Sequence, residues 1–158
     1  MSTYQLNDTY FTAERYKIYT LFCKADEINE KISQLQSQGI NVFNVGKELA
    51  GFIDKQHDNK YLNIEVFDQL KYFMEKKSVR IDGSINNVIA IYNLGILLEP
   101  ALELNAVQFL KEFSKSCAVI IIWENQAEVP HKLYWQTQSD NILFDFSDTP
   151  YKVLQYAV

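Results

Sequence analysis

Two uninterrupted apolar runs constrain the fold of this 158-residue chain more than any other feature. Residues 88–92 read VIAIY and residues 118–123 read AVIIIW, with no charged side chain in either run. Strands that are apolar on both faces are typical of sheets covered on both sides, and such sheets are mostly parallel. A helix predicted at residues 106–114 separates the two runs, which favours parallel strands joined by a crossover connection.

The remaining segments supply the other elements of an α/β fold. Further strands are predicted at residues 16–23, 41–45 and 142–146, with a short edge strand at 133–136. Helices are predicted at residues 25–38 and 47–55 and from Asn63 onward, where apolar side chains recur at spacings of three and four. We therefore predict a single α/β domain over residues 1–158, with three layers and a mostly parallel five-stranded sheet flanked by helices. Its parts are an N-terminal arm or helix (1–15), the core (16–146) and a C-terminal strand or helix (147–158).

The net charge of −5 lies entirely in the second half of the chain. Residues 1–80 carry 11 basic and 11 acidic side chains, whereas residues 81–158 carry 4 basic and 9 acidic ones. A protein that binds duplex DNA by itself usually has a basic excess, so duplex nucleic acid is not expected as a partner. The sequence leaves open whether the chain has a local basic patch. Two interpretations apply to Lys76, Lys77 and Arg80: they contact phosphate, or they compensate the dipole of the helix that they end.

The sequence predicts a cytoplasmic protein without a membrane partner. No apolar run approaches the roughly 18 residues that a membrane-spanning helix needs. The first residues, MSTYQLNDTYFT, lack the charged segment and apolar core of a signal peptide. Cys23 and Cys117 adjoin apolar runs and are interpreted as buried thiols in a reducing compartment, with a disulfide left open.

Ligands of an open parallel sheet bind at the carboxyl ends of its strands, so the residues after each strand are the candidates for a site. A phosphate-binding loop after the first strand would need glycines, a lysine and a Ser or Thr. This segment offers Lys24 but no glycine between Arg15 and Gln38, and it has carboxylates at Asp26 and Glu27. Carboxylates at a helix start occupy the position of a bound anion and repel a phosphate.

The other strand ends also depart from a nucleotide site. Lys47 follows Gly46, but it has no upstream glycine at the required spacing and no Ser or Thr after it. Tyr92 and Asn93 end the run at 88–92, where a magnesium-holding acid would stand. We find no residues spaced as metal ligands and no catalytic serine motif. The sequence thus predicts no catalytic residue, no metal and no cofactor.

The order of the elements resembles that of a known family. After a strand and a helix, the chain continues with INVFNVGKEL, a long helix, the run VIAIYNLGILLEPALELNAVQFLKEFSKSCAVIIIWEN and a closing FDF strand. This series is similar to the small P-loop protein of type-3 bacteriophage-exclusion (BREX) systems over residues 16–146, and most similar over residues 88–125. Members of that family resemble single AAA-type ATPase cores.

The resemblance implies a P-loop at residues 23–28, a magnesium-holding acid at Tyr92 or Asn93, and a sensor-like polar residue at Asn125. Because this chain lacks the glycines and the acid, the resemblance implies a degenerate relative that does not hydrolyse nucleotide. A function then follows as an expectation. The protein would bind other proteins, or a second copy of itself, within a bacterial anti-phage defence system.

Two further hypotheses belong to other classes. In the first, the chain is an acidic immunity or antitoxin-type protein that neutralises a basic partner. Its docking face would contain the acidic residues Glu124, Glu128, Asp140, Asp145 and Asp148. Trp135 is predicted separately, either as a core residue or as part of a surface for self-association or for a partner. In the second, the chain is an enzyme that uses Lys24, Asn93, Glu124 and Asn125, which would require a deep polar pocket at the strand ends.

Overall fold

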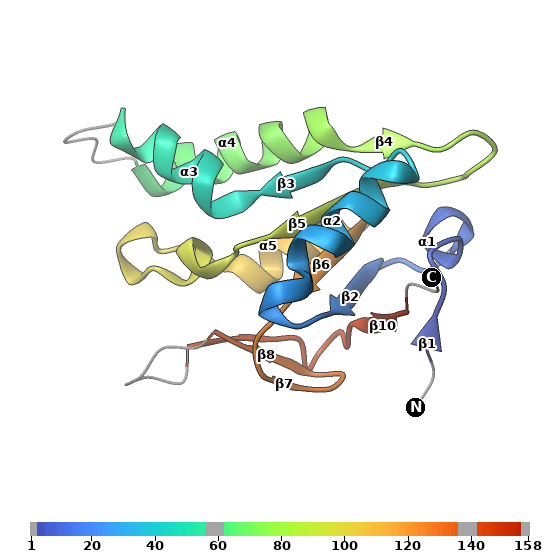
Figure 1. Ribbon diagram of the computed structural model, residues 1–158. Coiled ribbons are helices and arrows are strands. Elements are labelled where there is room, and N and C mark those ends of the chain that lie inside the picture. The colour runs from blue at the N-terminus through green and yellow to red at the C-terminus, as the bar shows by residue number, and fades with distance from the viewer. Residues whose placement is uncertain (1–2, 56–61, 136–141, 156–158) are drawn as a thin grey trace.

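The computed structural model describes residues 3–55, 62–135 and 142–155. In this part of the chain, a mixed sheet of seven mostly parallel strands is flanked by helices, and a smaller antiparallel sheet of three strands accompanies it (Figure 1). The strands are β1 (Thr3–Tyr4), β2 (Ile18–Phe22), β3 (Val42–Asn44), β4 (Val79–Arg80), β5 (Asn87–Tyr92), β6 (Cys117–Trp123), β7 (Ala127–Glu128), β8 (Lys132–Tyr134), β9 (Leu143–Asp145) and β10 (Lys152–Leu154). The helices are α1 (Asp8–Phe11), α2 (Ile28–Ser37), α3 (Val45–Asp54), α4 (Leu62–Lys77) and α5 (Ala106–Phe113), and short 3₁₀ turns occur at η1 (Ala25–Glu27), η2 (Gly95–Leu98) and η3 (Pro100–Leu102).

The two apolar runs form the centre of the main sheet, as predicted. The strand order is β1-β10-β2-β6-β5-β3, all parallel, and β4 pairs antiparallel with the beginning of β5. In the central pair, Ile89 lies opposite Val119 and Ile91 opposite Ile121. Helices on both faces cover these strands, which explains why neither run contains a charged residue. The α/β class and the mostly parallel sheet are therefore confirmed.

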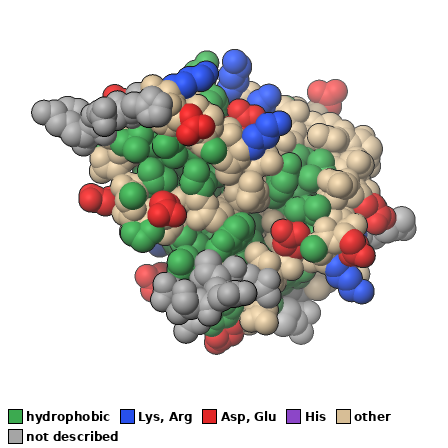
Figure 2. Space-filling view, turned by 60° about the vertical axis from the view of Figure 1, so that its left-hand side comes forward, with side chains coloured by type: hydrophobic (Ala, Val, Ile, Leu, Met, Phe, Trp, Pro, Cys, Tyr) green, Lys and Arg blue, Asp and Glu red, His purple; other side chains and the backbone are tan. Residues whose placement is uncertain are grey.

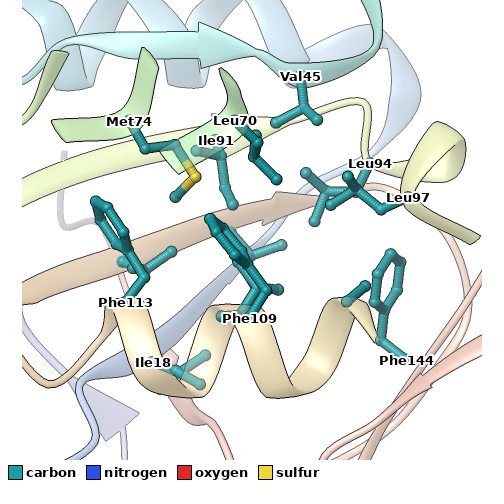
Figure 3. Close-up of a cluster of buried hydrophobic side chains, with 14 of the residues drawn as sticks. Ile18, Val45, Leu70, Met74, Ile91, Leu94, Leu97, Phe109, Phe113 and Phe144 are labelled. Carbon is teal, nitrogen blue, oxygen red and sulfur yellow. The ribbon is translucent and has the colours of Figure 1, made fainter. Parts of the chain in front are cut away.

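Alternate side chains of the strands pack into two cores, one on each face of the sheet. On one face, Tyr19 and Ile120 pack in a cluster that includes Leu35 of α2. On the other face, the cluster contains side chains of α3, α4, α5 and the small sheet. Figure 3 shows this second core, in which Leu70 and Phe109 point toward the strands. The fold therefore has three layers, with α1 and α2 on one side and the other helices opposite.

The position of the fifth strand was predicted wrongly. Residues 142–146 were expected to extend the main sheet, but β9 in this segment pairs with β8 in the small sheet. The place beside β2 is taken by β10 instead. Phe144 is buried while Asp145 is exposed, and this alternation suits an antiparallel sheet with one solvated face better than a strand covered on both sides.

Smaller differences concern short elements. The two-residue strands β1 and β4 raise the strand count of the main sheet from the predicted five to seven. The predicted edge strand at 133–136 corresponds to β8, and the C-terminal segment adopts the strand alternative as β10. Gly39, at φ +85°, follows the end of α2, because this left-handed conformation favours glycine. None of the helices in the described ranges is both long and apolar enough to cross a bilayer.

Candidate functional site

Four strand ends meet at one edge of the main sheet. Because β2, β6, β5 and β3 are parallel neighbours, the residues that follow them lie along the same edge. The predicted strand-end residues follow these strands or begin α3: Lys24, Asp26, Lys47, Tyr92, Asn93, Glu124 and Asn125. Figure 2 turns toward the viewer the side to which β3 and β5 point; hydrophobic side chains occupy much of it, with carboxylates among them and basic side chains gathered toward the top.

The loop after β2 satisfies its own backbone groups. The Glu27 carboxylate accepts a hydrogen bond from the Lys24 backbone N–H (2.9 Å), and the Glu27 N–H donates to the Lys24 carbonyl (2.9 Å). The Cys23 N–H donates to the carbonyl of Trp123 on the neighbouring strand (3.1 Å). A phosphate-binding loop needs free N–H groups that converge on the anion. In this loop, the Glu27 carboxylate takes the place of the anion and accepts from the Lys24 N–H.

An amide network joins the ends of β3 and β5. Asn44, the last residue of β3, accepts through Oδ1 from the Asn93 side-chain amide (2.9 Å) and from the Lys47 backbone N–H (3.0 Å). Its own amide donates to the Tyr92 hydroxyl (3.2 Å). Asn44 is therefore the N-cap of α3 and also binds Tyr92 and Asn93 at the end of β5. The sequence prediction missed Asn44 because it placed this residue inside a strand at 41–45 and began the helix at residue 47, whereas α3 begins at Val45.

Gly46 is required by the close approach of Asn93. The Gly46 N–H donates to the Asn93 carbonyl (3.0 Å), and a Cβ on Gly46 would lie 2.4 Å from Asn93 Nδ2. Asn93 itself adopts φ 59°, a left-handed conformation that Asn tolerates better than most residues. The Gly46-Lys47 pair thus belongs to a strand-to-helix connection, with the Lys47 side chain exposed.

Replacing Gly46 with alanine should therefore destabilise the fold by about 1–3 kcal/mol, because the new methyl group must displace the Asn93 amide from Asn44. Gly51 on the same helix is the matched control. A Cβ there meets no atom within 4 Å, so Gly51→Ala should stabilise the protein by about 0.5–1 kcal/mol. Urea unfolding of both variants measures the difference. Equal effects of the two substitutions would contradict this account of the amide network.

The end of β6 carries the remaining strand-end candidates. Asn125 is half-buried and Glu124 is exposed, and Glu124 lies near enough to Cys23 to act on its thiol. Burial, followed by the charges of Glu124 and Glu27, raises the pKa of Cys23, so this thiol stays protonated and is a poor nucleophile. Burial raises the pKa of Cys117 to about 12, with the same consequence. Both cysteines are free.

The acidic residues of the alternative hypothesis are exposed but partly neutralised. Glu128 and Asp145 lie on either side of Lys132 across the small sheet. Glu128 accepts a hydrogen bond from the Tyr134 hydroxyl (3.0 Å), which raises the pKa of that tyrosine. Hydrogen bonds from Ser147, together with the charge of Lys132, lower the pKa of Asp145. Among the other predicted interaction residues, Asp148 is exposed and Asp140 lies outside the described residues.

Trp135 is part of the packing beside this edge. Its ring lies 6.0 Å from the ring of Trp123 in an edge-to-face arrangement. A Cβ on Gly95 would come within 2.4 Å of the Trp135 ring, so the η2 turn needs glycine where the indole covers it. Half-buried Trp135 thus joins the small sheet to the main one, and its role as an interface residue stays a prediction.

Across the described residues, no group of three His, Cys, Asp or Glu side chains is placed to hold a metal ion. A hollow of about 650 Å³ lies between the beginning of α5 and β9, but its lining includes none of Lys24, Asn93, Glu124 and Asn125. Comparisons with protein-family models, curated proteins and solved structures found no match to this chain.

Proposed function

We propose that this chain is a P-loop-ATPase-like protein that does not hydrolyse nucleotide and acts by binding other proteins. The positions that the family resemblance assigns to the P-loop, the sensor and the magnesium-holding acid follow β2, β6 and β5. These strands are direct neighbours with β6 in the middle, so all three positions share one edge of the sheet. This arrangement supports a common architecture with the resembling family.

We infer the lack of nucleotide hydrolysis mainly from the hydrogen bond between the Lys24 N–H and the Glu27 carboxylate. A phosphate at this loop would have to displace a carboxylate and then lie beside it, at a Coulombic cost. At the end of β5, the Tyr92 hydroxyl accepts a hydrogen bond from Asn44 and the Asn93 amide donates one to it, and neither residue supplies the carboxylate that magnesium prefers. A role in cytoplasmic anti-phage defence is proposed from the resemblance at residues 88–125, and the two free thiols are consistent with that compartment.

Isothermal titration with ATP and magnesium tests this proposal. We expect no micromolar binding at the strand-end edge and no turnover, because the loop after β2 leaves no cradle for a phosphate. Lys24→Ala and Lys47→Ala should leave any weak heat of binding unchanged. Micromolar binding, or any ATP turnover, that either substitution abolishes would overturn the proposal.

The alternative acidic-protein function is favoured by the exposure of Glu124, Glu128, Asp145 and Asp148. Affinity purification from the native host at low and high salt separates the two proposals. A complex held by these carboxylates should dissociate at high salt, because exposed charge pairs are screened. A complex that survives high salt favours a partner bound mainly through apolar contacts.

A further inference from the structure

Three basic side chains surround one aromatic ring at the edge of the sheet opposite the strand ends. The Arg15 guanidinium carbon lies 5.4 Å from the centroid of the Tyr16 ring, Lys111 Nζ 5.3 Å and Lys115 Nζ 5.8 Å. Tyr16 and Arg15 precede β2, whereas Lys111 and Lys115 come from the end of α5 and the residues after it. Cation–π attraction to a shared ring therefore gathers three positive charges from two distant parts of the sequence.

A fourth and a fifth positive charge adjoin this group. The Lys17 ammonium is buried and donates to the carbonyls of Lys115 (2.7 Å) and Ser114 (3.4 Å). Lys152 lies near enough to lower the pKa of Lys17, although burial is the larger cause, and its Nζ also donates to the Tyr16 carbonyl (3.4 Å). We call Arg15, Tyr16, Lys17, Lys111, Lys115 and Lys152 the Tyr16 cluster.

Compensation of the α5 dipole does not explain the Tyr16 cluster. Lys17 already donates to the carbonyls at the end of that helix, which is the usual role of a basic residue there. Lys111 lies in the last turn of α5 and Lys115 follows the end of the helix. The ammonium groups of both lie over the Tyr16 ring, although that of Lys115 also pairs with Glu112.

Nearby carboxylates neutralise only part of this charge. Glu112 pairs with Lys115 (2.8 Å) and Glu14 pairs with Lys152. Within the described part of the chain, no carboxylate lies within 4.0 Å of the charged groups of Arg15 or Lys111. Those two charges, both within 5.4 Å of the same ring centroid, are left for an anion from outside.

The distribution of basic residues in the sequence supports this inference. Residues 81–158 contain only four basic side chains, and three of them belong to the Tyr16 cluster. One of the two arginines of the chain lies there as well. A protein with a net charge of −5 thus concentrates positive charge at this place.

We propose that the Tyr16 cluster binds a phosphate group. A phosphate carries up to two negative charges and several acceptor oxygens, and the guanidinium of Arg15 can donate to two of them in parallel. Lys111, in the last turn of α5, supplies a second charge beside the same ring. Because the ring already holds the cations in place, they lose less conformational entropy when they bind a phosphate. This inference goes beyond the proposed function, because the cluster lies at the opposite end of β2 from the degenerate loop.

Two probes test the site and identify the source of the phosphate. Sodium tripolyphosphate represents a free phosphate compound, and a short single-stranded oligothymidylate represents a nucleic-acid backbone. The double variant Arg15→Gln/Lys111→Gln should weaken binding of the recognised probe by about tenfold or more, with a shallower dependence on salt. Binding of tripolyphosphate alone would indicate a small ligand, and binding of both would indicate a strand backbone.

Lys24→Gln/Lys47→Gln is the matched control, since it removes two exposed charges from the other edge of the sheet. We expect it to change the affinity by less than about twofold. Tyr16→Leu, which keeps every charge but removes the ring, should weaken binding nearly as much as the loss of one cation. Amide NMR shifts during the titration should map to the cluster.

Four outcomes would overturn this inference. If neither probe binds, or if both double variants weaken binding equally, the cluster is not a phosphate site. If polyglutamate binds the cluster and neither phosphate probe does, the surface recognises an acidic protein instead. Loss of binding only in the Lys24/Lys47 variant would overturn this inference and also contradict the proposed function, whereas the first outcomes leave that function intact.

Discussion

Replacing Phe144 with alanine is expected to lower the free energy of unfolding by about 3–5 kcal/mol. Phe144, on β9, is fully buried, and its ring lies 5.8 Å from that of Trp123 on β6. It belongs to the same apolar cluster as Leu94 and Leu97, close to which it lies in Figure 3. Truncation would remove apolar contacts from both sheets and leave a cavity between them, and the cost of such a cavity adds to the lost transfer free energy.

Phe11→Ala is the matched control, because it removes the same side chain from a site that is 53% exposed. We expect this variant to stay within about 0.5 kcal/mol of the parent protein. Urea unfolding followed by tryptophan fluorescence measures both. If Phe144→Ala does not fold, Phe144→Leu should still fold and lose less than about 1.5 kcal/mol.

This experiment decides whether the small sheet is part of the cooperative unit. A loss below 1 kcal/mol for Phe144→Ala would mean that β7, β8 and β9 contribute little to the stability of the main fold. A large loss in a single transition would mean that the two sheets unfold together, as the edge-to-face contacts of Trp123 with Phe144 and Trp135 lead us to expect.

The central strands could be predicted because their environment is the same on both faces. Every residue of β6 is buried, so an uninterrupted apolar run is the only pattern that satisfies the strand. Residues 142–146 were misplaced because a short apolar run does not specify which sheet it joins. That choice depends on partners distant in sequence, here the packing of Phe144 and Phe146 in the cluster with Trp123.

In the candidate site, too, local features could be predicted from the sequence, whereas contacts between distant segments could not. The carboxylates after Lys24 are a local property of the sequence, and in the structure one of them, Glu27, accepts from the Lys24 N–H. The amide network around Asn44 depends on the pairing of β3 with β5, which residue spacing does not determine. The Tyr16 cluster joins residues from three distant parts of the sequence, and its local signals, a basic-aromatic-basic triplet and two lysines four apart, are too common to be specific.

A second large effect is expected at alkaline pH, where the protein should lose stability steeply. Burial raises the pKa of Cys117 from 9.0 to about 12 and that of Tyr19 from 10.0 to about 12, and it also raises the pKa of Tyr151. The unfolded chain releases these protons near the ordinary values while the folded chain keeps them. The unfolded state therefore binds fewer protons over this interval, and the free energy of unfolding falls as the pH rises.

Lys17 acts in the opposite direction below pH 10.5. Burial lowers its pKa from 10.5, so the folded chain loses this proton first, and the penalty for burying the charge is relieved as the pH rises toward 10.5. Above that value the three buried acids make the largest contributions, and Cys23, whose pKa is also raised, adds to them. Each of the three contributes up to about 1.4 kcal/mol per pH unit, so the combined slope between about pH 10.5 and 11.5 should approach 4 kcal/mol per unit.

Urea unfolding at a series of alkaline pH values measures this slope, and single variants apportion it. Cys117→Ala should reduce the slope by about 1.4 kcal/mol per unit, because the substitution removes one proton from the difference between the two states. Cys23→Ala, at a half-buried thiol, is the matched control and should reduce it less. A stability that stays level from pH 9 to 11 would show that Cys117 and Tyr19 ionise in the folded protein, which their full burial opposes.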